Sequence, residues 1–260
     1  MSYGQQVEYL YEDEHILVCR KPAGLAVQSA GLGTMDLESL LMNHLAEQAE
    51  KKSRAAKEPG NRQRKASEGG RPWLGVVHRL DQPVEGLLVF AKNQATAASL
   101  SRQVQDGRMK KEYLALVTPA GQGRKLLSEL GTDREMCLED WLIKDGKAHV
   151  SRVARAGEKN AKKAVLYFSC LPEDEWTAAP SAKDAGQALL RIRLITGRHH
   201  QIRVQLSHVG LPIAGDRKYG GSEGRIPDPS FVCLSACQLS FVHPASGKPL
   251  SFRMKPSFLL

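Results

Sequence analysis

Hydrophobic residues recur with two different periods along the chain, one typical of strands and one typical of helices. Short apolar or alternating runs predict strands at 16–19, 25–27, 87–91, 111–117, 189–195, 231–242 and 250–254. Helical spacing of the apolar residues covers 37–45, 93–106 and 202–209. Asn93 can cap the second helix, and Gly107 and Gly210 follow the last two as stop signals. The pattern predicts a mixed sheet with flanking helices and loops.

Two candidate functional residues lie where predicted strands meet loops. Asp81 follows the turn at 78–80 and precedes the apolar strand at 87–91, which places an acid at the lip of the sheet. Arg198 lies at a predicted strand-to-helix junction, a common place for sites. A lone Asp in a loop is more often a cap or a solvated residue, so spacing alone does not assign it a catalytic role.

The charge balance favours a polyanionic partner. Lys and Arg outnumber Asp and Glu by 37 to 28, which gives the 260-residue chain a formal charge of +9. Such an excess can contact phosphates and release counterions, so nucleic acid is the leading partner class. The alternative is that the basic excess only aids solubility. The remaining composition, 42% hydrophobic and 25% charged, is that of an ordinary globular protein.

One segment differs from the rest, because no Leu, Ile, Val or Phe occurs between Leu45 and Leu74. Residues 51–71 carry eight basic side chains against two acidic ones. Such a segment cannot bury enough apolar surface to fold alone. We expect a single domain over 1–260 with a basic, mobile insertion at about 47–72. The insertion could clamp RNA or could be a passive solvated loop.

The five cysteines are scattered and odd in number, which indicates buried free thiols in a reducing compartment. Cys233 and Cys237, with His243 beyond, lack a second ligand pair, so we expect no metal site there. No window approaches 18 uninterrupted apolar residues, and the N-terminus has neither part of a signal peptide. These features predict a cytoplasmic protein.

Four short motifs in a fixed order carry the most specific signal in the chain. They are RKPAGL at 20–25, HRLD at 78–81 with GLLVFAK at 86–92, KEYLALV at 111–117 and TGRHHQIRV at 196–204. This set resembles the RluA-type family of RNA pseudouridine synthases. GDRKYG at 215–220 and LSFVHP at 239–244 also match, so the resemblance runs from about Val7 to about Phe252. KPAG alone is weak, whereas HRLD with GLLVFAK and the distant GRHHQIR is highly specific.

The resemblance implies an α+β fold with a mixed, mostly antiparallel central sheet, the pseudouridine synthase catalytic fold. It implies an isomerase that detaches the uracil base from C1′ of a uridine in structured ribosomal or transfer RNA, rotates it and rejoins it through C5. The family needs no cofactor and no metal. We therefore expect RNA as the partner, a monomer, no membrane association and no S4-type RNA-binding domain ahead of Val7.

Three residues match the family's catalytic positions. Asp81 matches the nucleophilic aspartate, and attack on the sugar, attack on the base and a glycal route all stay open. An attacking carboxylate must be ionised, and Arg198 matches the arginine whose planar fork pairs with it. Tyr113 matches the tyrosine that can stack on the base and take part in proton transfer. From the residues alone, Tyr113 could equally be a half-buried strand aromatic.

The same motifs supply residues expected to bind RNA: His78, Arg79, Lys92, Lys111, His200, Gln201 and Arg203. The alternative for His78 is a histidine hydrogen-bonded within its loop. A metal pair of His199 and His200 is not expected, because adjacent residues on a helix point about 100° apart. The target base must leave the helical stack to meet Asp81, which implies flipping or a single-stranded loop target.

Several positions depart from the family pattern. Many members carry Thr-Ser where this chain has Val84 and Glu85, and Thr where it has His199. Val84 removes a hydroxyl, and Glu85 would repel phosphate if it faced RNA. Because the three catalytic matches remain, we expect a branch with a different substrate rather than a dead enzyme. The alternatives are an inactive RNA-binding protein and a metal-dependent hydrolase built on the histidines and Asp81.

Overall fold

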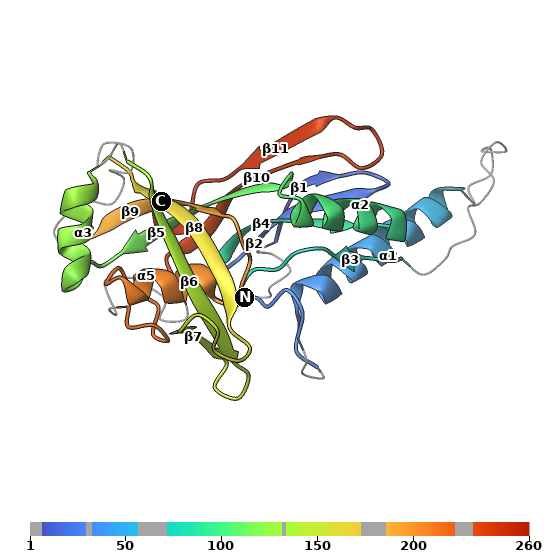
Figure 1. Cartoon of the computed structure of the whole chain (residues 1–260). Helices are drawn as coiled ribbons and strands as arrows, with labels where there is room; N and C mark the ends of the chain where they lie inside the picture. Colours follow the sequence, from blue (N-terminus) through green and yellow to red (C-terminus); the bar gives the residue numbers. More distant parts are fainter. Residues whose placement is uncertain are drawn as a thin grey trace.

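The computed structural model describes residues 7–29, 33–56, 72–131, 134–172, 186–221 and 231–259. These residues form an 11-stranded sheet with four helices and a 3-10 turn (Figure 1). The strands are β1 (Glu8–Glu12), β2 (Ile16–Lys21), β3 (Gly75–Val76), β4 (Glu85–Ala91), β5 (Lys110–Val117), β6 (Met136–Asp145), β7 (Val150–Ala154), β8 (Lys162–Cys170), β9 (Ala188–Leu194), β10 (Leu234–Val242) and β11 (Pro249–Arg253). The helices are α1 (Leu37–Ala56), α2 (Gln94–Gln105), α3 (Gln122–Leu130) and α5 (Gln201–His208), and the turn is η3 (Ser257–Leu259).

The sheet order is β1-β2-β4-β10-β5-β9-β8-β6-β7, with β3 added to β4 and β11 added to β10. Among the described strands, β4 and β10 pair in parallel and the other neighbours pair antiparallel. Helices α1 and α2 lie at the β1–β4 end, and α5 lies beside β6 and the β6–β7 hairpin (Figure 1). The predicted α+β class with a mostly antiparallel sheet is confirmed.

Strand β4 shows why an uninterrupted apolar run follows the Asp81 loop. Leu87 and Val89 belong to the cluster that packs under α2, whereas Leu88 and Phe90 belong to the larger core on the other side. Successive side chains of a strand point to opposite faces, so a strand covered on both faces must be apolar throughout. The strand that follows Asp81 is therefore fixed inside the molecule.

The first helix begins as predicted and ends later. The Asp36 carboxylate accepts a hydrogen bond from the backbone N–H of Ser39, which caps the helix. The helix then continues to Ala56, past the predicted end at 45, because Glu, Gln, Lys and Ala sustain a helix without burial. The expected insertion at 47–72 therefore begins as a helix, and residues 57–71 lie outside the described residues.

Helix α2 agrees closely with its prediction. The Asn93 side chain accepts from the Thr96 backbone N–H at 2.9 Å, and Gly107 adopts a positive φ of 70° after the last turn. Leu100 is buried in the cluster under this helix, and Ala97 and Val104 pack against it. The predicted cap, stop signal and inward stripe are confirmed.

Two parts of the sequence prediction differ from the structure. Residues 25–27 are not a strand; the carbonyls of Ala26 and Val27 accept hydrogen bonds from the first turn of α1. Strands β6, β7 and β8 were not predicted. Their exposed and half-buried positions carry many charged residues, so the apolar alternation is diluted.

All five cysteines are free thiols. Cys19 and Cys233 are buried as predicted, whereas Cys137 is exposed on β6. His243, considered with Cys233 and Cys237, instead contacts the carboxylate of Asp13 at 2.8 Å. No helix within the described ranges is long and apolar enough to cross a membrane.

Candidate active site around Asp81

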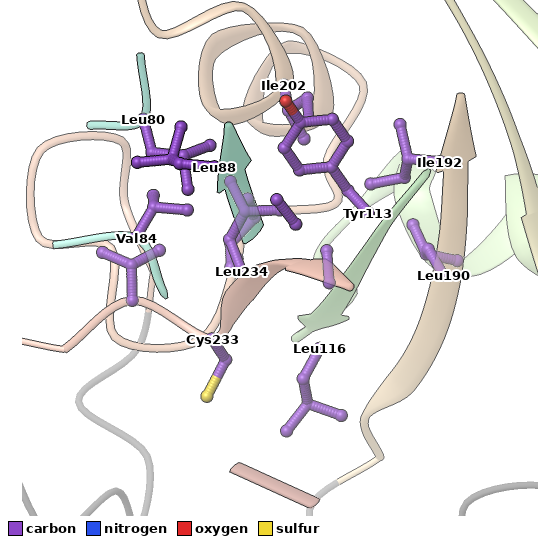
Figure 2. Packing of buried hydrophobic residues seen from close by; sticks show 14 of the residues in the cluster. Leu80, Val84, Leu88, Tyr113, Leu116, Leu190, Ile192, Ile202, Cys233 and Leu234 are labelled. Atoms are coloured by element: carbon purple, nitrogen blue, oxygen red, sulfur yellow. The ribbon is translucent and has the colours of Figure 1, made fainter. Parts of the chain in front are cut away.

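The loop that carries Asp81 is anchored on both sides. Leu80 and Val84 are buried in the main core, and the Val84 N–H donates to the Asp81 carbonyl at 3.1 Å (Figure 2). Between these anchors the Asp81 side chain keeps 27% of its surface exposed. A buried residue on each side of a partly exposed carboxylate fixes its position and leaves it accessible.

Lys21 contacts the same loop from the interior of the protein, where the residue is 0% exposed. Its ammonium donates to the carbonyl oxygens of Pro22, Leu25 and Gln82 at 2.9, 2.7 and 3.0 Å. Burial lowers the pKa of Lys21 to about 7, opposed by the charges of Asp81 and Glu85. The weak KPAG motif is thus joined directly to the residue after Asp81.

Arg203 is the cation that pairs with Asp81. Its Nη1 lies 3.1 Å from Asp81 Oδ2, and its Nε and Nη2 donate to the two oxygens of Asp216 at 2.7 and 2.8 Å. Arg203 and Asp216 are both buried. A guanidinium fixed on one side by two parallel hydrogen bonds can hold a second carboxylate in a defined position.

The expected ion pair between Arg198 and Asp81 is wrong. The Arg198 side chain is exposed, and its Nε donates to the Lys163 carbonyl at 2.9 Å. Helix α5 starts after Arg198, so Arg203 lies in its first turns with Ile202 and Val204 buried on either side. The sequence held a signal for Arg203, because it lies among apolar helix residues and would need a buried acid as partner. The aspartate of GDRKYG, Asp216, supplies that acid.

Tyr113 lies in the wall of the same site. It is buried on β5, between Ala236 of β10 and Ile192 of β9 in register, and its hydroxyl points toward Ile202 of α5 (Figure 2). Burial raises the pKa of the phenol, and the charge of Asp81 raises it further. The phenol therefore stays protonated at neutral pH. Its closeness to Asp81 agrees with the predicted grouping.

His200 also approaches Asp81, with Nε2 3.7 Å from Oδ2. It caps α5 in the left-handed conformation, at φ 53° and ψ 27°. Its ring stacks on His199 at 3.8 Å between centroids, so the expectation that the two rings point apart is wrong: His200 precedes the helix. Among the described residues no group of His, Cys, Asp and Glu is arranged to hold a metal ion.

Several residues expected to bind RNA have internal contacts instead. His78 is buried and its Nε2 accepts from the Val89 N–H of β4 at 3.2 Å, so it bonds to the neighbouring strand and not within its own loop. Burial lowers the pKa of His78 well below its ordinary value, so the ring is neutral. Lys92 pairs with Glu12 at 2.9 Å. The predicted RNA contacts of these two residues disagree with the structure.

The other predicted RNA contacts divide into two groups. Gln201 is buried and bridges Thr196, the Arg198 N–H and the Val165 carbonyl, so it shapes the turn before α5. Arg79 is exposed, and Lys111 is half-buried on the face of β5 that carries Tyr113. Burial lowers the pKa of Lys111. Arg79 and Lys111 stay as predicted contacts.

The departures at Val84 and Glu85 are structural. Val84 fills the core, and Glu85 is 2% exposed, with Oε2 3.0 Å from Arg20 Nη2 and Oε1 accepting from the Ser257 N–H at 2.7 Å. The next residue, Gly86, has φ 143°, and a Cβ there would lie 2.6 Å from Ala236 backbone atoms. Glu85 therefore faces the C-terminal turn and does not face the exposed side of Asp81.

The chain also matches proteins of known family. The family model described as RNA pseudouridylate synthase matches residues 15–208, more than half of the chain. Ribosomal large subunit pseudouridine synthase D of Nitrosomonas europaea is 33% identical over 253 residues, 94% of this chain and 60% of that protein. The protein of the same name from Zymomonas mobilis is 30% identical over 256 residues, 95% of this chain and 68% of that protein.

The chain thus spans about 60 to 68% of the length of these two curated relatives. The solved structure of human RNA Pseudouridylate Synthase Domain Containing 1 has a TM-score of 0.67 and 20% identity, covering 99% of this chain and 86% of that chain. At that identity the likeness shows the fold. The chain belongs to the RNA pseudouridylate synthase family, as its motifs predicted.

Proposed function

We propose that the chain is an RNA pseudouridine synthase that converts uridine to pseudouridine in structured ribosomal RNA. The observation that carries the proposal is the asymmetric setting of Asp81. Its Oδ2 is held by Arg203, and its Oδ1 accepts no hydrogen bond from any residue that the structure describes. The relatives from Nitrosomonas europaea and Zymomonas mobilis are named for the large ribosomal subunit, which supports ribosomal over transfer RNA.

The proposed reaction is an isomerisation without net oxidation or reduction, so a single carboxylate can start it without an oxidant or a reductant. The bond from uracil N1 to C1′ breaks, a bond from C5 to C1′ forms, and a proton leaves C5 while N1 gains one, so atoms and electrons balance. Asp81 can start this exchange by attack on the sugar or the base, or by opening a glycal route. Arg203 pairs with the carboxylate through Oδ2 and fixes its direction.

Tyr113 is proposed to contact the detached base. The residue is 5% exposed in this structure, so stacking of a planar base on its ring requires the bound nucleotide to uncover the ring. Because burial raises its pKa, the hydroxyl can donate a hydrogen bond at neutral pH and does not act there as a base. Tyr113 therefore orients the base or supplies a proton.

A basic rim is proposed to hold the RNA backbone: Arg79, Lys144, Arg198 and Lys218, all exposed. Burial lowers the pKa of His199 most, and the charge of Lys144 lowers it further. Lys218 has a smaller effect in the same direction, so both lysines lie within electrostatic reach of His199. The Lys218 ammonium donates to the His149 carbonyl at 3.3 Å, which joins it to the β6–β7 turn. We propose that these cations flank the path by which the flipped nucleotide enters.

The test is a carbodiimide tagging map of ribosomal and transfer RNA from cells with and without the gene. We expect one or more ribosomal sites to disappear on deletion, to return with the wild-type gene and to stay absent with Asp81→Asn. If the lost pseudouridine sites lie only in transfer RNA, the substrate is transfer RNA and not ribosomal RNA. Unchanged maps with tight RNA binding would overturn the activity and favour an RNA-binding protein.

The rim has its own test. Lys144→Gln with Lys218→Gln should weaken RNA affinity roughly 10-fold near physiological salt and reduce the salt slope by about two ions. The matched control is Lys125→Gln with Lys147→Gln, two exposed lysines outside the named rim. Equal affinity and slope in both double variants would remove the rim from the RNA interface.

A further inference from the structure

A chain of hydrogen bonds reaches Asp81 from the β6–β7 hairpin. The backbone N–H of Ser151 donates to the Tyr219 hydroxyl oxygen at 2.7 Å, and that hydroxyl lies 2.8 Å from Nδ1 of His200. The other ring nitrogen of His200, Nε2, lies 3.7 Å from Asp81 Oδ2. Nothing in the proposed reaction so far uses Tyr219 or His200.

The donors in this chain determine where the His200 proton lies. A backbone N–H can only donate, so the Tyr219 oxygen accepts from Ser151 and keeps one hydrogen to donate. The acceptor within reach of that hydrogen is His200 Nδ1. A neutral imidazole carries one N–H, so donation from Tyr219 to Nδ1 puts that proton on Nε2, which faces Asp81. Tyr219 thus selects the tautomer of His200.

The surroundings of His200 keep its ring neutral. Burial lowers the pKa of His200 to about 4, the charge of Asp81 opposes this, and those of Arg203, His199 and Lys218 add to it. The left-handed backbone of His200, rare for a residue other than glycine, directs the ring toward Asp81 instead of along the helix. A neutral donor can steady a carboxylate without protonating it.

We propose that His200 is a positioning residue: Tyr219 fixes its tautomer so that Nε2–H faces Oδ2 of Asp81, which leaves Oδ1 as the reacting oxygen. This deepens the proposed function and depends on it. Arg203 and His200 then restrain the same oxygen from two directions.

The kinetic test compares two amides in the full-length protein. The Gln side-chain nitrogen can take the place of imidazole Nε2, whereas the shorter Asn reaches only the position of Nδ1. Single-turnover pseudouridine formation should fall on the order of 10-fold in His200→Asn, recover to within about 3-fold in His200→Gln, and fall about 3-fold in Tyr219→Phe. RNA affinity should change less than about 2-fold in all three variants.

The matched control is His208→Gln, an exposed histidine at the other end of α5. It should retain wild-type rates. Equal rates in His200→Gln and His200→Asn, or wild-type rates in both, would overturn the positioning role. If His200→Asn fails to fold, the Tyr219→Phe rate and the spectra below still decide the matter.

Nitrogen-15 spectra of the histidine rings test the tautomer without any turnover. We expect the His200 signal, assigned by its loss in His200→Gln, to show a proton on Nε2 and a bare Nδ1 at pH 7. In Tyr219→Phe the His200 signal should shift toward a mixture of the two tautomers. A wild-type ring protonated on Nδ1 overturns the proposal. If wild-type protein makes no pseudouridine while the spectra agree, the proposed function fails and the tautomer assignment stands.

Discussion

Asp81 and Glu85 lie four residues apart, and their carboxylates are in opposite situations. Asp81 is partly exposed, with one oxygen held by Arg203 and the other without a hydrogen bond from any described residue. Glu85 is buried, with Oε2 paired to Arg20 and Oε1 accepting from the Ser257 backbone. Asp81 therefore has one carboxylate oxygen without a hydrogen-bond partner among the described residues, whereas both oxygens of Glu85 have partners.

The difference teaches that burial and partner count, more than charge or neighbourhood, separate a reactive carboxylate from a structural one. Both acids have an arginine partner at about the same distance. Within the described part of the chain, only Asp81 of these two acids combines a held oxygen with an unengaged one. An unengaged oxygen on a buried acid would be costly, so such an oxygen is tolerated where water or substrate can reach it.

The largest expected effect separates the two acids by activity. Asp81→Asn should reduce pseudouridine formation roughly 1000-fold or more, because the amide cannot act as an anionic nucleophile. Glu85→Gln should stay within about 2-fold per folded molecule. Both are measured by single-turnover assays with RNA affinity determined in parallel. Comparable losses in both variants would erase the distinction between the acids.

The next effect separates the two arginines of the GRHHQIR motif. Arg203→Lys should lower the rate on the order of 100-fold, because a lysine cannot hold Asp216 with two contacts and Asp81 with a third. Arg198→Lys should change it less than about 3-fold. The same assay decides, with thermal melting to confirm folding. A larger loss at Arg198 would restore the original ion-pair prediction.

A smaller effect is expected on stability. Glu85→Gln should lower the free energy of unfolding by ~2 kcal/mol, below the cost of breaking a fully buried pair because Arg20 keeps some exposure. For a domain of this size the melting temperature should drop by about 5 °C. Arg20→Met with Glu85→Gln should lose less than the sum of the single variants. Strict additivity would show that the two side chains are not coupled.

The last effect concerns pH and the buried lysine. Lys21 has a pKa of about 7 when folded and an ordinary value near 10.4 when unfolded. Between these values the unfolded chain binds more protons, so the contribution of Lys21 to stability rises with pH, and below about pH 7 it is constant. The stability of wild type relative to Lys21→Met should therefore increase from pH 7 to pH 10.

Chemical denaturation at both pH values measures this difference, with exposed Lys110→Met as the matched control. Groups that titrate in both proteins cancel in the comparison. A gap between wild type and Lys21→Met that stays the same at the two pH values would mean that the Lys21 ammonium keeps its charge throughout.

The sequence predicted those elements whose buried face is regular. Leu87, Val89 and Leu100 repeat with the period of their strand or helix, so β4 and α2 were found. Strands β6 to β8 were not, since their charged faces hide the alternation. Choosing between Arg198 and Arg203 required knowing that His200 turns left-handed just before the helix, and no apolar period encodes that. Lys21 and Gln82 meet across 61 positions, which local patterns do not reveal.

The single hydrogen bond from Ser257 to Glu85 links the far end of the chain to the strand that follows Asp81. Removing Ser257 and the residues after it would leave Glu85 with Arg20 as its one remaining partner named above. Loss of the residues around η3 is therefore expected to lower the yield of folded protein, while turnover per folded molecule changes little, as for Glu85→Gln.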